Sequence, residues 1–305
     1  MNSVDIRKYE GIFPAFYACY DDNGEISPER TRNFTSYLIN KGVQGLYVGG
    51  SSGECIYQSV AERKLILENV MSVATGKISI IAHVACNNTK DSQELAAHAE
   101  SLNVDAIAAI PPIYFHLPAH SIIDYWNDIS AAAPTTDFII YNIPQLAGVA
   151  LTLPILKEMR KNPRVIGVKN SSPSTQDIQM WKSEGGQDFV VFNGPDEQFI
   201  SGLAIGASGG IGGTYAVMPE LFLRTYRLFH EGNISAALNV QNDICQIIYK
   251  ICEAHGNLYA VIKAILKKQG VSVGGVRKPI SSLIPEDLKI VDEAYNMINS
   301  AINKL

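Results

Sequence analysis

Short apolar segments alternate with longer segments of helical periodicity along most of this 305-residue chain. Eight of the short segments are apolar almost throughout, which is typical of parallel strands covered by helices on both faces. Their starts lie roughly 20–35 residues apart, the length of one strand followed by one helix. The eight expected strands span residues 11–20, 45–48, 78–85, 105–110, 137–142, 165–169, 189–193 and 206–212.

The segments between these strands carry helix signals. Ser27 precedes Pro28, and this order predicts a helix start, because serine caps free N–H groups and proline suits the first helical position. Residues 61–74 and 91–102 also have helical apolar spacing. Eight strands alternating with helices predict an α/β fold, a (β/α)8 TIM barrel. A doubly wound sheet is the alternative, which the short gaps and the number of strands disfavour.

The last part of the chain contains only helical patterns. They cover residues 219–230, 234–255, 258–268 and 285–302. We therefore expect residues 1–218 to form the barrel, and residues 219–305 to form its last helix and a C-terminal helical extension, as one structural unit. The weakest strand prediction is 206–212, because that segment consists mostly of small residues.

Composition and charge exclude several classes of protein. Lys and Arg total 25 against 30 Asp and Glu, so the basic face of a nucleic-acid binder is not expected. No apolar run approaches the roughly 20 residues of a membrane span, and residues 1–10 lack the apolar core of a targeting segment. The five cysteines form no CxxC pair and no zinc spacing, which favours free thiols in a reducing, cytoplasmic location.

Polar residues at the carboxyl ends of the strands are the candidates for chemistry, because barrel active sites lie there. The second strand ends in residues 49–54, GGSSGE. Its glycines allow a tight turn, and Ser51 and Ser52 supply hydroxyl and N–H donors before a helix. This predicts an anion-binding turn for a carboxylate or phosphate. An ordinary Gly/Ser loop is the alternative.

The fifth and sixth strands end in Tyr141 and Lys169. A lysine is seldom buried without a role, and apolar surroundings favour its neutral amine, a nucleophile towards carbonyls. A tyrosine at the barrel mouth can carry protons. In the alternative, the sixth strand ends one residue early and leaves Lys169 in solvent, while Tyr141 is an aromatic core residue.

Acids, histidines and cysteines complete the set of candidates. Asp196 and Glu197 follow the seventh strand, where they could bind sugar hydroxyls or a metal, or cap a helix. His83 lies within a strand and is expected in the core, and the six histidines show no metal-site spacing. A metal-dependent aldolase is therefore disfavoured. Cys245 and Cys252, seven residues apart on one helix, are expected in the core.

Three motifs occur together and in order: GGSSGE after the second strand, YNIP after the fifth and GVKNSS after the sixth. In this combination the whole chain resembles the pyruvate-dependent class I aldolase family, which contains dihydrodipicolinate synthase and N-acetylneuraminate lyase. It is most similar to the lyases in the stretches GLYVGGSSGECIYQS, IAHV, YNIPQLAGV, NGPDEQFISG and GGIGGTY. The synthases usually keep an arginine shortly after YNxP, whereas this chain has Gln145, Leu146 and Ala147 there and no arginine between Arg63 and Arg160. A second substrate carboxylate would be poorly bound without that fork of donors.

The resemblance implies aldol cleavage of N-acetylneuraminate, a sialic acid, to N-acetylmannosamine and pyruvate. In the roles it implies, Lys169 forms the Schiff base and Tyr141 relays protons. Tyr114 would stand near the relay, often across a subunit contact. No metal or organic cofactor is implied, and a homotetramer is expected. The implied substrate contacts are Ser51 and Ser52 for the carboxylate, and Ser171, Gly194, Asp196, Glu197 and Gly213 for the sugar.

Four positions depart from the pattern of the lyases. Ser52 and Ser171 each replace a usual threonine and keep the hydroxyl, whereas Gly213 replaces a usual serine and Ala216 a usual asparagine. A lost hydrogen bond is worth about 0.5–1.5 kcal/mol, enough to change substrate preference but not reaction class. Two alternatives stay open. One is another pyruvate aldolase, acting on a 2-keto-3-deoxy sugar acid or synthase-like. The other is a non-catalytic sugar-acid binding protein, which the presence of Lys169 and Tyr141 disfavours.

Overall fold

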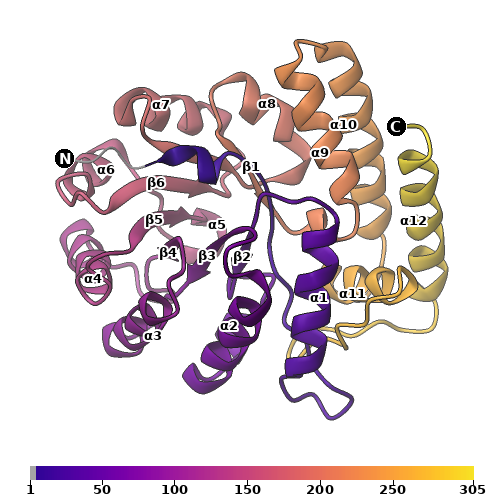
Figure 1. Ribbon diagram of the computed structural model, residues 1–305, viewed down its shortest axis with the longest axis horizontal. Helices are drawn as coiled ribbons and strands as arrows, with labels where there is room; N and C mark the ends of the chain where they lie inside the picture. The colour runs from indigo at the N-terminus through magenta and orange to yellow at the C-terminus, as the bar shows by residue number, and fades with distance from the viewer. Residues whose placement is uncertain (1–4) are drawn as a thin grey trace.

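The computed structural model describes residues 5–305. Residues 1–4, which belong to the expected barrel unit and to the stretch examined for a targeting segment, lie outside the described residues. Eight strands form a single parallel sheet at the centre of the molecule, with helices around it (Figure 1). The strands are β1 (Gly11–Pro14), β2 (Gly45–Val48), β3 (Ser79–His83), β4 (Ala106–Ala109), β5 (Asp137–Asn142), β6 (Val165–Asn170), β7 (Val190–Asn193) and β8 (Gly209–Gly212).

The sheet closes into a barrel. The strand order is β1-β8-β7-β6-β5-β4-β3-β2, and every neighbouring pair is parallel. The two ends of this order meet where Ala15 forms a parallel bridge with Tyr47 and the Phe16 N–H donates to the Tyr47 carbonyl at 2.8 Å. This confirms the (β/α)8 TIM barrel and excludes the doubly wound alternative, whose sheet stays open.

Helices follow the strands in the expected alternation. The Ser27 hydroxyl accepts from the Arg30 N–H at 3.2 Å and Pro28 occupies the first turn, so the first helix begins where the sequence predicted. The helices of the barrel are α1 (Pro28–Asn40), α2 (Val60–Ala74), α3 (Thr89–Ser101), α4 (Ala119–Ala131), α5 (Pro144–Ala147), α6 (Leu153–Met159), α7 (Thr175–Gly185), α8 (Phe199–Ala204) and α9 (Pro219–His230).

The first and last strands differ from expectation in an informative way. The apolar run 11–20 forms a strand only as far as Pro14, which has no N–H for a ladder, although residues after it remain buried. The apolar run at residues 11–20 therefore indicated that these residues are buried, but it did not show where the strand ends. The weak glycine-rich segment does form β8, because any side chain at Gly209 would collide with the backbone of Gly11 on β1.

Three helices follow the barrel and pack along one side of it, at the orange-to-yellow end of the chain in Figure 1. They are α10 (Ile234–Ile251), α11 (Leu258–Lys268) and α12 (Asp287–Ile302). Residues 269–286 are not helical and connect α11 to α12. The division into 1–218 and 219–305 stays a prediction. Among residues 5–305, every helix is too short or too polar to cross a membrane.

Candidate active site

A cavity of about 310 Å³ opens at the carboxyl ends of the strands. Side chains and turns from β2, β5, β6, β7 and β8 meet there, as expected for a barrel mouth. The cavity brings together all but one of the residues to which the sequence assigned a catalytic or substrate-binding role. These are Ser51, Ser52, Tyr141, Lys169, Ser171, Gly194, Asp196, Glu197 and Gly213.

Lys169 and Tyr141 are placed by the sheet itself. They are register partners on the adjacent strands β6 and β5, so the backbone ladder sets their separation. The Lys169 Nζ lies 3.8 Å from the centre of the Tyr141 ring and 4.6 Å from that of Tyr47. Lys169 is only 5% exposed, so the alternative of a solvated lysine is wrong. The two aromatic rings and the strand therefore hold the amine in one place at the wall of the cavity.

Tyr141 titrates in an unusual environment. Burial by itself would raise the pKa of Tyr141, but the Lys169 ammonium and the nearby hydroxyls of Ser51 and Ser171 outweigh burial and bring that pKa below its usual value. A phenol with a lowered pKa exchanges its proton more readily near neutral pH. Tyr141 is therefore equipped to accept and return a proton beside the lysine.

His83 packs beside this pair from β3 and is buried. Its Nδ1 donates to the Gly49 carbonyl at 2.9 Å, and its ring packs edge-on against Tyr141. Burial, together with the nearby charges of Arg63 and Lys169, holds the pKa of His83 well below its usual value, so the ring is neutral. This confirms the expected core role of His83.

The turn after β2 offers donors to the cavity. No backbone carbonyl within residues 5–305 accepts a hydrogen bond from the N–H of Ser51 or of Ser52. The turn is closed instead by the Gly53 N–H, which donates to the Gly50 carbonyl at 3.0 Å. Free N–H groups and two hydroxyls at a strand end are the kind of donors that can bind an anion such as a carboxylate.

Asp196 lies in the buried wall of the cavity. Its Oδ2 accepts from the Thr214 N–H at 2.8 Å and from the Thr214 hydroxyl at 2.6 Å. Asp196 and Glu197 also lie in the first turn of a short helix, Asp196–Gln198, so the helix-terminus alternative and a place in the cavity hold together. Its Oδ1 is buried and has no hydrogen-bond partner among residues 5–305. Burial, opposed in part by Thr214, raises the pKa of Asp196 to about 7. The carboxyl group can therefore accept hydrogen bonds from a polyol or, when protonated, donate one.

This raised pKa predicts a pH-dependent stability difference. Between about pH 4 and 7 the folded chain keeps the Asp196 proton that the unfolded chain has lost, so the free energy of unfolding falls as pH rises. The Asp196→Asn variant has no proton to lose at this position, so its free energy of unfolding does not fall in this way. Measured relative to the parent, its free energy of unfolding should rise across this pH range by at most about 4 kcal/mol. Urea denaturation at several pH values measures the difference. Glu197→Gln, at the exposed neighbouring acid, is the control, and parallel curves for Asp196→Asn and the parent would contradict the assignment.

Ser171 is held by tight packing between strands. Its N–H donates to the Asn142 carbonyl at 2.8 Å, and the Gln145 amide donates to its carbonyl at 2.6 Å. Any side chain at Gly194 would collide with the Ser171 hydroxyl and with the Asn170 carbonyl. The glycine therefore lets the β7 turn approach the Ser171 hydroxyl, and both line the cavity.

Tyr114 is the one predicted site residue that lies outside the cavity of its own chain. It is 86% exposed, has a φ of 87°, and its ring packs edge-on against Phe115. The expectation for Cys252 is wrong: it is exposed, and it lines the cavity from just beyond α10. Its helical spacing from Cys245 does not distinguish the core side of a helix from a side facing a cavity.

Several cavity residues were missed by sequence reasoning. Tyr47 on β2 and Thr214 after β8 sit at strand ends, and a search of every strand end for polar side chains would have found them. Tyr259 on α11 also lines the cavity, and its ring packs edge-on against that of Tyr17 at 5.7 Å. No local motif marks Tyr259, because only the tertiary fold brings α11 to the barrel mouth.

The barrel and its mouth together define a class of protein. A buried lysine beside a tyrosine of lowered pKa, with the hydroxyl-bearing turn of Ser51 and Ser52 in the same cavity, is the equipment of a class I aldolase, a carbon–carbon lyase. Residues 8–297 match the dihydrodipicolinate synthetase family, and the chain belongs to that family.

Comparison with individual relatives shows which members of this family the chain resembles. An N-acetylneuraminate lyase of Mediterraneibacter gnavus is 63% identical over 301 residues, which cover 98% of this chain and 96% of the relative. The wild-type sialic acid aldolase of Ruminococcus gnavus has a TM-score of 0.97 at 63% identity, covering 97% of this chain and 99% of that one. A catalytic lysine mutant of the same aldolase has a TM-score of 0.98 at 62% identity, covering 98% and 99%. The resemblance to the pyruvate-dependent aldolases, and among them to the lyases, is confirmed.

Proposed function

We propose that this chain cleaves N-acetylneuraminate to N-acetylmannosamine and pyruvate through a Schiff base on Lys169. The observation that carries the proposal is the enclosed pair of Lys169 and Tyr141, with Nζ 3.8 Å from the ring centre, in a cavity shared with hydroxyl and carboxyl groups. The 63% identical relative is an N-acetylneuraminate lyase, and the closely similar aldolase has a catalytic lysine. Both support this substrate and this nucleophile.

Imine formation is the first step of the proposed mechanism. The neutral Lys169 amine attacks the C2 ketone of the open-chain sugar acid, and the C2 oxygen takes up one proton from the amine and one from solvent and leaves as water. The free N–H groups and hydroxyls of Ser51 and Ser52 hold the adjacent carboxylate and so orient C2 towards Nζ. The resulting iminium draws electrons from C3.

Carbon–carbon cleavage is the second step. Tyr141 in its phenolate form accepts the proton of the C4 hydroxyl, the C3–C4 bond breaks, and the electron pair of that bond moves through C2 to the imine nitrogen. N-acetylmannosamine leaves, and an enamine of pyruvate remains on Lys169. Tyr141 returns its proton to C3, and water then hydrolyses the imine to release pyruvate. The lowered pKa of Tyr141 suits both directions of this proton transfer.

The remaining wall of the cavity suits a polyol. Ser171, Asp196 and Glu197 offer hydroxyl and carboxyl oxygens that accept hydrogen bonds from sugar hydroxyls. Gly213 offers no side chain where the lyases usually have serine, so we propose altered affinity there rather than altered chemistry. The position after YNIP is occupied by Gln145, which supplies an amide rather than the arginine fork that a second carboxylate needs. This disfavours a synthase-like reaction.

Borohydride trapping with N-acetylneuraminate as the sole substrate tests the proposal. A reduced pyruvyl adduct on Lys169, located by peptide mass analysis, would demonstrate both imine formation and C3–C4 cleavage. Trapping by pyruvate but not by N-acetylneuraminate would retain the class I aldolase and exclude this substrate. Trapping by neither would favour the sugar-acid binding protein.

The assembly and location of the chain are further parts of the proposal. A homotetramer is supported by the exposed apolar side chains of Ile56, Tyr114, Phe115 and Leu146, of which Ile56 and Leu146 line a second cavity beside the first. In that assembly Tyr114 would approach the proton relay of a neighbouring subunit. Analytical ultracentrifugation should give four times the 33.3 kDa of one chain. The five free thiols support a cytoplasmic location.

A further inference from the structure

An ion pair is buried directly behind the turn that carries Ser51 and Ser52. The Lys263 Nζ on α11 donates to the Glu54 Oε1 at 2.6 Å, with side-chain exposures of 1% and 0%. The same Nζ donates to the Gly275 carbonyl at 2.6 Å. Removing two charges from water costs much of the free energy that their attraction supplies, so such a pair adds little to the stability of the fold by itself. Its better-attested use is to fix one arrangement of the surrounding chain.

Glu54 closes the turn in a conformation that needs support. Its φ of 56° and ψ of 29° are in the left-handed region, which residues other than glycine seldom occupy. Its N–H donates to the Ser51 carbonyl at 2.9 Å, so the peptide at Ser51 is tied to the Glu54 backbone. The position of the Glu54 side chain thus influences the orientation of the Ser51 and Ser52 donors.

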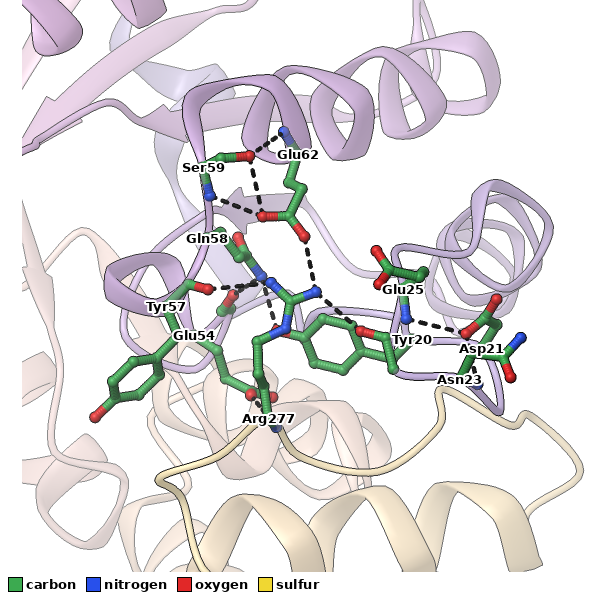
Figure 2. A network of polar contacts seen from close by, with 12 residues as sticks. Tyr20, Asp21, Asn23, Glu25, Glu54, Tyr57, Gln58, Ser59, Glu62 and Arg277 are labelled. Atoms are coloured by element: carbon green, nitrogen blue, oxygen red, sulfur yellow. Dashed lines mark hydrogen bonds and ion pairs between the residues drawn. The ribbon is translucent and has the colours of Figure 1, made fainter.

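The second oxygen of Glu54 is also held by the C-terminal part of the chain. Oε2 accepts from the Arg277 N–H at 2.8 Å. The Arg277 guanidinium in turn donates to the Tyr57 carbonyl at 3.0 Å and pairs with Glu62 at 2.7 Å, and it stacks over the Tyr20 ring (Figure 2). Arg277 therefore ties the segment between α11 and α12 to the end of the turn and to the start of α2.

We infer that Glu54 and Lys263 are positioning residues for the carboxylate of the substrate, so that α11 of the C-terminal extension is a working part of the active site. Lys263 acts in two ways. It holds Glu54 in the left-handed conformation that presents the Ser51 and Ser52 donors, and it neutralises a carboxylate that would otherwise repel the anionic substrate. This inference rests on the proposed function, because it assigns the bound carboxylate to that turn.

The distinguishing readout is the difference between two ketones. Pyruvate and hydroxyacetone both form an imine with a lysine, but only pyruvate carries a carboxylate. If Lys263 acts on the carboxylate site, its loss weakens pyruvate binding and leaves hydroxyacetone unaffected. If Lys263 only stabilises the fold, its loss alters both ketones alike or neither.

The experiment compares the parent chain with the Lys263→Met variant. In each, borohydride trapping of Lys169 is measured as a function of the concentration of each ketone. We expect the half-saturating pyruvate concentration and the KM for N-acetylneuraminate to rise by about tenfold, as when one well-placed charge-assisted contact is lost. Hydroxyacetone trapping and kcat should stay close to those of the parent. Lys268→Met is the matched control, since this lysine ends the same helix and pairs with Asp292 on α12, and it should leave all four quantities unchanged.

A second variant covers the case in which Lys263→Met does not fold, because that change leaves Glu54 charged and buried. The double variant Glu54→Gln/Lys263→Met removes both charges, and Glu54→Gln alone keeps an oxygen that can accept from Lys263. We expect the double variant to weaken pyruvate trapping selectively, and Glu54→Gln to do so less. Equal losses for both ketones, or no loss for either, would overturn the inference.

Trapping measurements on the parent chain distinguish a failure of this inference from a failure of the proposed function. Trapping by pyruvate without cleavage of N-acetylneuraminate would exclude the proposed substrate, while the ratio of variant to parent still decides the role of Lys263. Absence of trapping by pyruvate in the parent would overturn both.

Discussion

Replacing Lys169 with alanine is expected to abolish cleavage of N-acetylneuraminate and all trapping by borohydride at this site. The imine nitrogen is the electron sink of the proposed reaction, and within the cavity lining Lys169 is the only amine side chain of the described residues. The substitution removes an amine enclosed by Tyr47 and Tyr141 and leaves space in their place. Activity assays and mass analysis after borohydride treatment measure the result.

Circular dichroism and thermal unfolding establish that the Lys169→Ala chain is folded. Lys182→Ala is a suitable control, because this lysine donates to the Phe189 carbonyl just before β7, at the opposite end of the barrel from the cavity. It should retain full activity. Substantial turnover by Lys169→Ala, or a pyruvyl adduct on a different lysine in the parent, would refute the Schiff-base assignment.

Replacing Tyr141 with phenylalanine is expected to lower kcat by about 10²–10⁴-fold, the usual contribution of a positioned proton-transfer group. The ring still packs against Lys169, Tyr47 and His83, so substrate binding should change little. Imine formation with pyruvate should persist, since it does not need C3–C4 cleavage. Steady-state kinetics and pyruvate trapping together separate these steps.

Tyr215→Phe is the matched control for Tyr141→Phe. Tyr215 is also a buried tyrosine and is absent from the cavity lining, and its hydroxyl has no hydrogen-bond partner in the part of the chain that the structure describes. Its loss of a hydroxyl should leave kcat close to that of the parent. An increase in KM with unchanged kcat for Tyr141→Phe would show that the phenol binds substrate rather than transfers a proton.

The barrel and its central residues could be predicted from the sequence because each rests on a local pattern. Eight buried runs at strand–helix spacing imply closure, and closure puts the residues after each strand at one mouth. Tyr141 and Lys169 end adjacent strands, so finding them paired needed only the strand order. Asp196 was likewise placed at the cavity, although its link to Thr214 across two turns was not foreseen.

The contributions of the C-terminal helices could not be predicted in this way. The apolar spacing of α11 identifies a helix, but it does not say that Lys263 enters the interior or that Tyr259 reaches the cavity. Those placements depend on how α11 crosses the barrel, which is set by packing between segments more than 200 residues apart along the chain. The same reasoning explains Cys252, which lies just beyond α10 and lines the cavity instead of packing in the core.

The pairing of Tyr141 with Lys169 across two strands has a consequence for how such enzymes diversify. The two residues proposed to break the carbon–carbon bond are spaced by the sheet, whereas Ser171, Gly194 and Asp196 stand in the connections beyond the strands. Turns tolerate replacement and insertion far better than a closed barrel does. Libraries restricted to those turns should therefore change which aldehyde is released while pyruvate remains the common product, so that one scaffold can be retuned into a series of aldolases.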